Sequence, residues 1–404
     1  MSSPTDDILR SVNTSEIVSR FTTIASQIGM TRLAPVTGLD RLGLPVAAAY
    51  RPNARSISVN HGKGLSEDAA KASAAGEAIE VYHAETIDLD VITVSYLDLL
   101  AERSIADPYR LPQPVQGTFA TETPMDWITG YTLDGEQERM VPLESVSLDF
   151  TYQHSGKPGA FLASSSGMGT GSTLAEACLH GICELIERDA HTMWLLRGKP
   201  FQEKTRIDIN TIKNADCRNI LDTCLSKDLL VGAWNLTSDI QMPVIMFALV
   251  ERERQAPSFV PYALGTGCHP DPGIAAVKAL TEAVQMRLTQ ITSVRDDLKT
   301  SDYLSENETF WTNKKTEILK ENAYQAWPSE EPGFNLHECL EFVIRELHVA
   351  GLSDTCFVDL SKPALGIPVV KMVVPGLEDG IEGEDQRRGE RAMRALMKRA
   401  EDAS

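Results

Sequence analysis

Three segments of this 404-residue chain share one pattern, in which a glycine-rich turn precedes a predicted helix. In each helix an alanine lies seven residues before a glutamate, and a second glutamate or a glutamine follows three residues later. A repeated unit of strand, glycine turn and helix favours an α+β fold built from similar units. The matching positions are Gly64, Ala70, Glu77 and Glu80; Gly171, Ala177, Glu184 and Glu187; and Gly267, Ala275, Glu282 and Gln285.

Hydrophobic periodicity places further elements around these helices. Apolar or small residues at helical spacing predict helices over residues 8–29, 66–85, 173–196 and 273–292. Apolar stretches predict strands over 44–52, 54–62, 229–238, 243–253, 355–362 and 367–376, and strand-and-turn structure over 91–100 and 140–150. The strands at 229–238 and 243–253 are expected to pair as a hairpin. We therefore expect mixed or antiparallel sheets packed with helices.

The charge and the cysteines exclude several classes of protein. A formal net charge of -19 argues against a protein that binds nucleic acid or an anionic membrane. The N-terminus lacks the features of a signal peptide, and no apolar run reaches the ~18 residues of a membrane span. The seven cysteines are scattered and form no Cys-x-x-Cys, so neither a disulfide framework nor a zinc site is indicated. We expect a cytoplasmic protein with small, buried cysteines.

The glutamates lie on helix faces that are unusual for solvated surfaces. At ~100° per residue, Ser73, Glu77 and Glu80 fall within ~60° of one another. Alanines flank this stripe, so another backbone can approach it closely. On the second helix a stripe of ~80° is formed by Glu176, His180, Glu184, Glu187 and His191. A single Glu-x-x-Glu is typical of a solvated face, but three such helices together favour a functional site.

Clustered carboxylates repel one another unless a cation lies between them, and Mg²⁺ prefers oxygen ligands and commonly bridges to phosphate. We expect Glu77, Glu80, Glu184 and Glu187 to hold one or more Mg²⁺ ions, with a further contribution from Glu282 or Gln285. The glycine turns offer N–H groups to phosphate. Lys63, Arg188 and Arg287 are candidates for direct phosphate contacts. The chain has neither a Walker motif nor a dinucleotide-binding motif, and its helices do not show the paired Glu-x-x-His motifs of the di-iron bundles.

Four stretches identify a family that the chain resembles. They are "SVNHGKGLSEDAAKASAAGEAIEVYHAE", "SSSGMGTGSTLAEACLHGICELIERDA", "GTGCHPDPGIAAVKALTEAVQMRLTQITSVRDD" and "VDLSKPALGIPVVKMVVPGLE", and the resemblance that they carry extends over about residues 35 to 380. They resemble the YcaO family. The resemblance implies the YcaO fold and an ATP- and Mg²⁺-dependent enzyme that acts on backbone amides of peptides. A nucleophile attacks the amide carbonyl, and ATP then phosphorylates the oxygen so that it leaves as phosphate.

The resemblance also implies roles for particular residues. Carried over by motif, Ser73, Glu77, Glu80, Ser172, Glu176, Glu184, Glu187 and Arg188 resemble ATP- and Mg²⁺-binding residues. Glu282, Gln285, Arg287 and Arg295 resemble a third contributing segment. No catalytic residue is assigned, and His61, His180 and Asp296 are candidates for a general base. The expected domains are an N-terminal helical extension over 1–30, a YcaO catalytic domain over 31–380 and a charged tail over 381–404.

Two departures from the family pattern bear on the product. Ser166 and Ser172 occupy the "SNG" and "GN" positions, and their hydroxyls are compatible with ATP binding. Azoline-forming members typically end in a proline-rich tail, whereas the sequence here has no proline after Pro375 and continues as a basic segment of helical pattern. This favours the branch that resembles TfuA-associated members, in which an external sulfide source converts an amide into a thioamide.

Three functions are compatible with the sequence. The favoured one is thioamide formation in a peptide or protein substrate, with help from a TfuA-like or peptide-recruiting partner. The second is cyclodehydration to an azoline or a related amidine closure in ribosomal peptide biosynthesis. The third is a non-catalytic ATP-binding scaffold. The basic stretch 387–399 is a candidate contact for the partner or for an acidic leader peptide, and a homodimer is also compatible with the chain.

Overall fold

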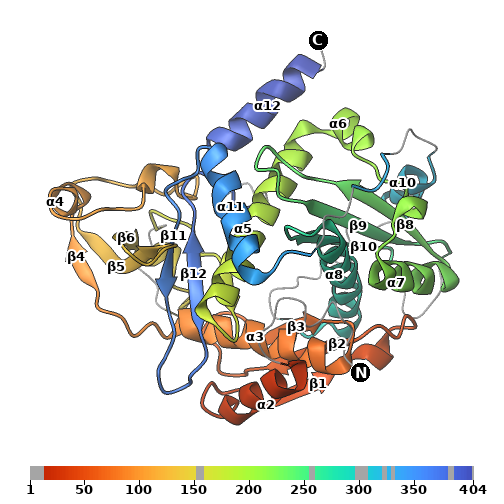
Figure 1. Ribbon diagram of the computed structural model, residues 1–404, viewed down its shortest axis with the longest axis horizontal. Helices are drawn as coiled ribbons and strands as arrows, with labels where there is room; N and C mark the ends of the chain where they lie inside the picture. Colours follow the sequence, from red (N-terminus) through yellow and green to blue (C-terminus); the bar gives the residue numbers. More distant parts are fainter. Residues whose placement is uncertain are drawn as a thin grey trace. The chain divides into compact units, whose positions relative to one another are not determined.

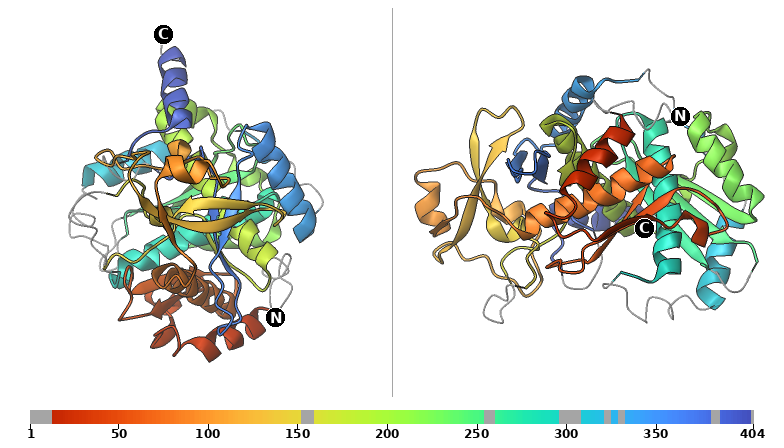
Figure 2. Two further views of the ribbon diagram at one scale, coloured as in Figure 1. Left: turned by 90° about the vertical axis from the view of Figure 1, so that its left-hand side faces the viewer. Right: turned by 90° about the horizontal axis from the view of Figure 1, so that it is seen from below.

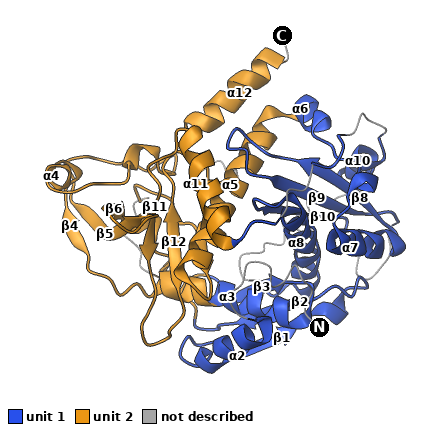
Figure 3. Cartoon of the chain, in the orientation of Figure 1, with its two compact units in different colours: residues 1–53, 57–78, 199–335 blue, residues 54–56, 79–198, 336–404 orange. Residues whose placement is uncertain are grey.

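The computed structural model describes residues 13–151, 159–253, 260–295, 308–320, 325–328, 333–380 and 386–402, and Figure 1 shows their elements. The chain divides into two compact units, which Figure 3 colours separately. Unit 1 comprises residues 1–53, 57–78 and 199–335, and unit 2 comprises residues 54–56, 79–198 and 336–404. Helix α3 (Glu67–Glu85) contributes its first part to unit 1 and its last turns to unit 2.

The larger core of unit 1 forms around an antiparallel sheet of order β10-β9-β8. The central strand β9 is buried along its whole length, which explains its nearly continuous apolar sequence. Helix α8 packs on β10 and β9, and α7 packs on β8 and α8 (Figures 1 and 2). These elements are β8 (Leu229–Asn235), β9 (Val244–Glu251), β10 (Tyr262–Cys268), α7 (Ala215–Ser226) and α8 (Pro272–Thr292).

A second antiparallel sheet of unit 1 has the order β1-β2-β3 and also contacts α8. Its central strand β2 is alanine-rich and almost fully buried. The remaining elements of unit 1 are β1 (Arg32–Pro35), η1 (Thr37–Leu39), β2 (Val46–Tyr50), β3 (Val59–Lys63), α2 (Thr14–Ile24), α6 (Lys199–Lys204), η4 (Ile209–Thr211) and α10 (Glu308–Leu319).

Unit 2 is built on a six-stranded antiparallel sheet of order β4-β5-β11-β12-β7, with β6 paired to β5. Helix α5 packs on β7 and β12, and both α11 and α12 pack on α5. The strands are β4 (Ile92–Val94), β5 (Met125–Thr132), β6 (Glu138–Pro142), β7 (Met168–Thr170), β11 (Cys356–Asp359) and β12 (Val369–Val373). The helices are α4 (Tyr96–Leu100), η2 (Pro108–Arg110), η3 (Leu143–Ser145), α5 (Leu174–Arg197), α11 (Leu336–Val349) and α12 (Glu390–Asp402).

The three repeated segments form three strand–helix pairs of the same construction: β3 with α3, β7 with α5, and β10 with α8. A β-carbon added at Gly62, Gly169 or Gly267 would lie 2.5, 2.1 and 2.2 Å, respectively, from a helix carbonyl oxygen. In each case that carbonyl belongs to the alanine eight residues later. These close contacts explain why glycine and alanine recur, and they place the first glutamate fifteen residues after the strand glycine. The predicted alignment of Gly64 and Gly171 with Gly267 is therefore offset by two residues.

The predicted α+β class with antiparallel sheets and repeated strand–glycine–helix units is confirmed. The helices predicted over 66–85, 173–196 and 273–292 match α3, α5 and α8, and the predicted hairpin is β8 with β9. The strand-and-turn prediction for 91–100 is wrong in part, because Ser95 caps a short helix, α4. Helices α7 and α11 were not predicted. Within the predicted helix at 8–29, α2 covers 14–24, and residues before 13 lie outside the described part.

Two further expectations concern cysteines and membrane spans. All seven cysteines lie in the described part, are buried and form no disulfide, as predicted. Among the described residues, no helix is both long and apolar enough to cross a membrane. The domain boundaries expected at residues 30 and 380 stay a prediction.

Candidate nucleotide and metal site

The start of α5 is fixed by Thr173 and Glu176. The Thr173 hydroxyl accepts a hydrogen bond from the Glu176 N–H at 3.2 Å, which makes Thr173 the N-cap. The Glu176 carboxylate accepts the N–H of Ser172 at 2.7 Å. Glu176 and Ser172, both predicted to bind ATP, are therefore brought together at this helix terminus. The N-terminus of a long helix favours anionic groups through its free N–H groups and its dipole.

Glu184 lies two turns further along α5 and contacts the turn that precedes β7. Its carboxylate accepts the N–H of Gly167 at 3.1 Å and lies 3.6 Å from the guanidinium of Arg188. The surrounding protein raises the pKa of Glu184 by desolvation, and the charge of Glu187 raises it further. The charges of Arg188 and Lys371 and the Gly167 N–H act in the opposite direction. A bound cation would favour the ionised form of this carboxyl group.

The next residues of α5 are largely buried. Glu187 is 6% exposed, and the side chain of Asp189 has no exposed surface. Asp189 pairs with Arg391 of α12 through contacts of 2.9 and 2.8 Å, and it also accepts the N–H of Glu378 at 3.1 Å. Because Asp189 follows Glu187 and Arg188 directly, this ion pair ties α12 to the part of α5 that carries the predicted ligands.

In unit 1, two predicted residues of different elements are in contact. Lys63, at the end of β3, forms an ion pair with Glu282 of α8. One turn further along α8, Gln285 donates to the His61 carbonyl at 3.2 Å, while its buried Oε1 atom has no hydrogen-bond partner among the described residues. Strand β3 and helix α8 thus present a lysine, a glutamate and a glutamine together. The unpartnered amide oxygen is an acceptor that a ligand could satisfy.

Helix α3 carries Ser73, Glu77 and Glu80 on one face. Glu80 is 7% exposed, whereas Ser73 and Glu77 are half-buried. The helix lies close to β3 because Gly62 has no side chain, and a β-carbon added there would lie only 1.9 Å from the Ala74 nitrogen. Carboxylates with this degree of burial are held at a cost in desolvation, which is typical of functional sites.

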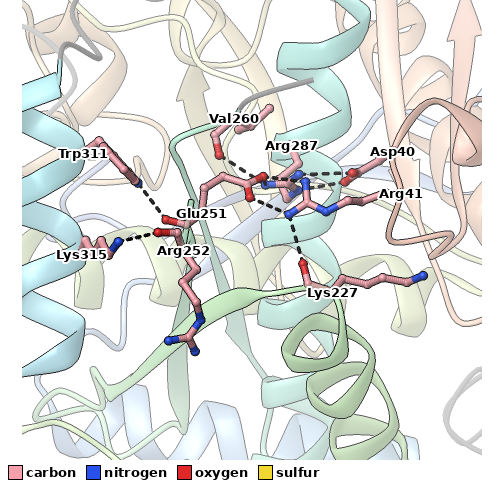
Figure 4. Close-up of polar contacts among 9 residues, drawn as sticks. All are labelled: Asp40, Arg41, Lys227, Glu251, Arg252, Val260, Arg287, Trp311 and Lys315. Atoms are coloured by element: carbon pink, nitrogen blue, oxygen red, sulfur yellow. Dashed lines mark hydrogen bonds and ion pairs between the residues drawn. The ribbon is translucent and has the colours of Figure 1, made fainter. Parts of the chain in front are cut away.

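Arg287, a predicted phosphate contact, is engaged in ion pairs inside unit 1. Its side chain is fully buried and forms ion pairs with Asp40 at 2.9 Å and Glu251 at 3.0 Å (Figure 4). These contacts favour a structural role for Arg287. Arg295, the other predicted arginine of this segment, is half-buried just beyond the end of α8.

The donor set fits Mg²⁺ in its chemistry. The predicted metal ligands Glu77, Glu80, Glu184 and Glu187 supply only oxygen atoms, as Mg²⁺ prefers, and two of them are buried. Among the described residues, no three His, Cys, Asp or Glu side chains converge as a ready-made metal centre. This is compatible with Mg²⁺ that enters with phosphate and water as further ligands.

The candidates for a general base lie in different environments. His61 is fully buried in β3, and its Nε2 atom lies 3.3 Å from the Thr292 hydroxyl. His180 is exposed on α5, and Asp296 lies outside the described residues.

Two residues of this region were not singled out from the sequence. Lys371 of β12 is 5% exposed and donates to the Ser164 and Ser166 carbonyls, the latter at 2.7 Å. Asp189 lies within the predicted helix 173–196 and was assigned no role there. The sequence does contain a signal for Lys371. It lies in the middle of the apolar strand 367–376, where a charged residue must find a buried partner.

Comparisons with known proteins agree with the fold. A model of the family described as "YcaO cyclodehydratase, ATP- and Mg²⁺-binding" matches residues 61–378. An "uncharacterized protein in tfuA 3'region" of Rhizobium leguminosarum bv. trifolii is 31% identical over 375 residues, which cover 91% of this chain and 88% of that protein. An uncharacterized protein of Methanothermobacter thermautotrophicus is 31% identical over 383 residues, with 91% and 95% covered.

Two solved structures resemble the chain at 20% identity. A heterocyclase in complex with substrate and cofactor matches with a TM-score of 0.73 over 92% of this chain, and the match spans only 53% of that heterocyclase. YcaO from Methanopyrus kandleri, bound with AMPPCP and Mg²⁺, matches with a TM-score of 0.65 over 92% of both chains. The predicted fold and the predicted ATP and Mg²⁺ cofactors are confirmed at the level of the family.

Proposed function

Because the chain belongs to the YcaO family, we propose that it uses ATP and Mg²⁺ to convert a backbone amide of a peptide or protein into a thioamide. The observation that carries the choice of product is the similarity to the relative from the tfuA 3'region, which extends over 91% of the chain. A TfuA-like partner would then deliver the sulfide or the substrate.

The chemistry follows from the poor leaving ability of an amide oxygen. Sulfide forms a bond to the carbonyl carbon, and the carbonyl electron pair moves onto oxygen. This oxygen receives the γ-phosphoryl group of ATP, and ADP is released. Loss of the sulfur-bound proton and departure of phosphate then leave a C=S bond. The net reaction consumes amide, sulfide and ATP and yields thioamide, ADP and phosphate.

The proposed binding residues fall into three sets. Glu77, Glu80, Glu184 and Glu187 would hold Mg²⁺, which would neutralise phosphate charge during transfer. Lys63, Ser73, Ser172, Glu176, Arg188, Glu282, Gln285 and Arg295 would contact or orient the nucleotide. We leave Arg287 out of this proposal, because Asp40 and Glu251 occupy its guanidinium.

The family description favours a second candidate function. It names cyclodehydratases, so the same residues would support closure of a Cys, Ser or Thr side chain onto the preceding amide, with loss of water. In this reaction the side chain supplies the nucleophile and sulfide is not needed. The two functions therefore differ in one co-substrate and in the mass of the product.

Mass spectrometry of a candidate peptide tests the proposal. The peptide is incubated with the protein, ATP, Mg²⁺, sulfide and the TfuA-like partner. We expect a mass gain equal to the replacement of oxygen by sulfur, which disappears without ATP or sulfide. Loss of one water without sulfide would instead establish cyclodehydration. ATP binding with neither product nor phosphate release would instead support a non-catalytic ATP-binding scaffold.

Helix α12 is the proposed contact for the partner. Its inner face is anchored by Arg391, and Figure 2 shows that the helix extends away from the rest of unit 2. Its outer face exposes Met393 and Met397, with Arg394 and Lys398 beside them. Basic residues with exposed methionines, in a chain of net charge -19, are complementary to an acidic segment with an apolar anchor.

Charge reversal separates recruitment from catalysis. In the variant R394E/K398E we expect about tenfold less partner-dependent modification at low salt, with unchanged affinity for Mg²⁺·ATP. The variant K204E/K213E changes the net charge equally at two exposed lysines elsewhere and serves as the control. Equal losses in both variants would refute a specific role for α12.

A further inference from the structure

The turn formed by residues 164–167 is held by a buried lysine from a neighbouring strand. Lys371 of β12 donates to the carbonyl oxygens of Ser164 and Ser166. The Ser164 hydroxyl also accepts the Ser166 N–H at 3.1 Å, and Met372 donates to the Gly167 carbonyl at 2.8 Å. All of these residues belong to unit 2. The turn is thus fixed at successive peptide groups, and the Lys371 ammonium binds two of its carbonyls.

One peptide group joins Lys371 to Glu184. The Ser166 carbonyl accepts from Lys371 at 2.7 Å, and the N–H of the same peptide group, on Gly167, donates to Glu184 at 3.1 Å. In a trans peptide the C=O and N–H bonds point in opposite directions. The ammonium on one side therefore orients the N–H toward the carboxylate on the other. It also polarises the peptide group, which strengthens the second hydrogen bond.

Glycine makes this peptide group easy to reorient. Gly167 has a φ of 82°, and a β-carbon there would lie 2.9 Å from the Met372 carbonyl oxygen and 3.0 Å from the Leu185 side chain. No side chain at this position restrains the turn, so its orientation depends on the groups that bind its carbonyls. Without the ammonium, a flipped peptide would aim a carbonyl oxygen at Glu184.

We propose that Lys371 is a positioning residue for the nucleotide and metal site, acting on Glu184 through the Ser166–Gly167 peptide group. This inference rests on the proposed function, in which Glu184 binds Mg²⁺. Burial lowers the pKa of Lys371, while the charges of Asp379 and Glu184 act in the opposite direction. The residue is buried at a cost in solvation that its contacts with two carbonyls and a nearby carboxylate offset.

The variant Lys371→Met tests the inference in the full-length protein. We expect the dissociation constant and the KM for Mg²⁺·ATP to rise about tenfold, equivalent to about 1.4 kcal/mol, with the KM for the peptide unchanged. A merely structural role would lower the active fraction and hence kcat, without changing the KM for ATP. Lys362→Met is the matched control, because Lys362 lies on the same hairpin and donates to a carbonyl, that of Thr86. It should stay within about twofold of the wild type.

Hydrogen exchange gives a readout that does not depend on ATP. In Lys371→Met, exchange in the segment 164–168 should accelerate about tenfold relative to Lys362→Met, because the turn loses its anchor. If the wild-type protein does not bind Mg²⁺·ATP, the proposed function fails, and the inference that rests on it fails as well. Unchanged exchange and unchanged ATP affinity would overturn it. If Lys371→Met does not fold, Lys371→Gln, which keeps a donor without the charge, is measured instead and should show the same direction.

Discussion

Arg287 belongs to a cluster of four charged side chains inside unit 1. It contacts Asp40 through two nitrogens, at 2.9 and 3.2 Å, and Glu251 at 3.0 Å. Glu251 also pairs with Arg41, whose side chain is 26% exposed (Figure 4). The side chains of Arg287, Asp40 and Glu251 are at most 2% exposed. Charges buried to this degree stay ionised only when they are paired and hydrogen-bonded.

Arg287→Met should therefore lower the free energy of unfolding by about 3–5 kcal/mol, because Asp40 loses its charged partner. Arg41→Met is the control and should cost clearly less, since Glu251 keeps Arg287. Urea denaturation measures both. The KM of the folded variant for Mg²⁺·ATP should not change. A raised KM with unchanged stability would instead support the phosphate contact expected from the sequence.

His269 is a second residue whose environment has a measurable consequence. It is 5% exposed, and its Nδ1 atom accepts the Asp271 N–H at 2.9 Å. Burial lowers the pKa of His269 to about 3 from an ordinary value of 6.5, and the charge of Lys278 acts in the same direction. Between these pH values the ring is neutral in the folded protein and protonated in the unfolded chain. Its contribution to stability is thus present above pH 6.5 and is lost as the pH falls toward 3.

His269→Asn removes this titration and keeps an acceptor for the Asp271 N–H. Between pH 7 and pH 5 we expect the wild type to lose about 2 kcal/mol more stability than the variant. Urea denaturation of both proteins at the two pH values gives this difference directly. Equal losses would show that His269 is not held in its neutral form.

At the scale of elements, the strand glycines decide where the glutamates lie. Gly169→Ala would place a methyl group 2.1 Å from the Ala177 carbonyl, so β7 and α5 must separate. We expect the free energy of unfolding to fall by about 1–3 kcal/mol. ATP turnover should fall by more than this loss of stability accounts for, because Glu184 moves with α5. Gly38→Ala is the control, since a β-carbon there meets no atom within 4 Å. Full turnover in a folded Gly169→Ala would refute this coupling.

The elements also show what the sequence predicts well. Long helices such as α5 and α8 were predicted within a few residues, because their periodicity and caps are local properties. Helix α4 was missed because it has only five residues, too few for a helical period to be recognised. The sheet order β4-β5-β11-β12-β7 was not predicted, since its pairings of β5 with β11 and of β12 with β7 join strands about two hundred residues apart.

The residues of the candidate site were likewise predicted from the sequence only in part. The repeat identified Glu77, Glu184 and Glu282, because close strand–helix contacts impose a fixed spacing on the chain. The contacts of Arg287 could not be predicted, since Asp40 and Glu251 lie far from it in sequence. The role of Lys371 was not predicted for a similar reason, because its partners lie more than two hundred residues earlier in the chain.

For the whole molecule, the net charge of -19 disfavours the approach of ATP without its metal. Mg²⁺·ATP should bind the folded protein and stabilise it by about 2.7 kcal/mol at a hundredfold excess over the dissociation constant. The melting temperature measures this shift. ATP in EDTA should give none, because the carboxylates would then face phosphate without a cation between them.

The rise in melting temperature caused by Mg²⁺·ATP should be absent in Glu77→Ala and in Glu184→Ala. Both variants should also lose ATP turnover while they stay folded. Glu102→Ala, an exposed glutamate outside the proposed residues, should respond as the wild type does. A wild-type shift in either site variant would refute the assignment of that residue. A shift by ATP in EDTA would refute the metal role and leave nucleotide binding in place. The metal and the nucleotide are thus tested separately, and the result applies whichever peptide product is formed.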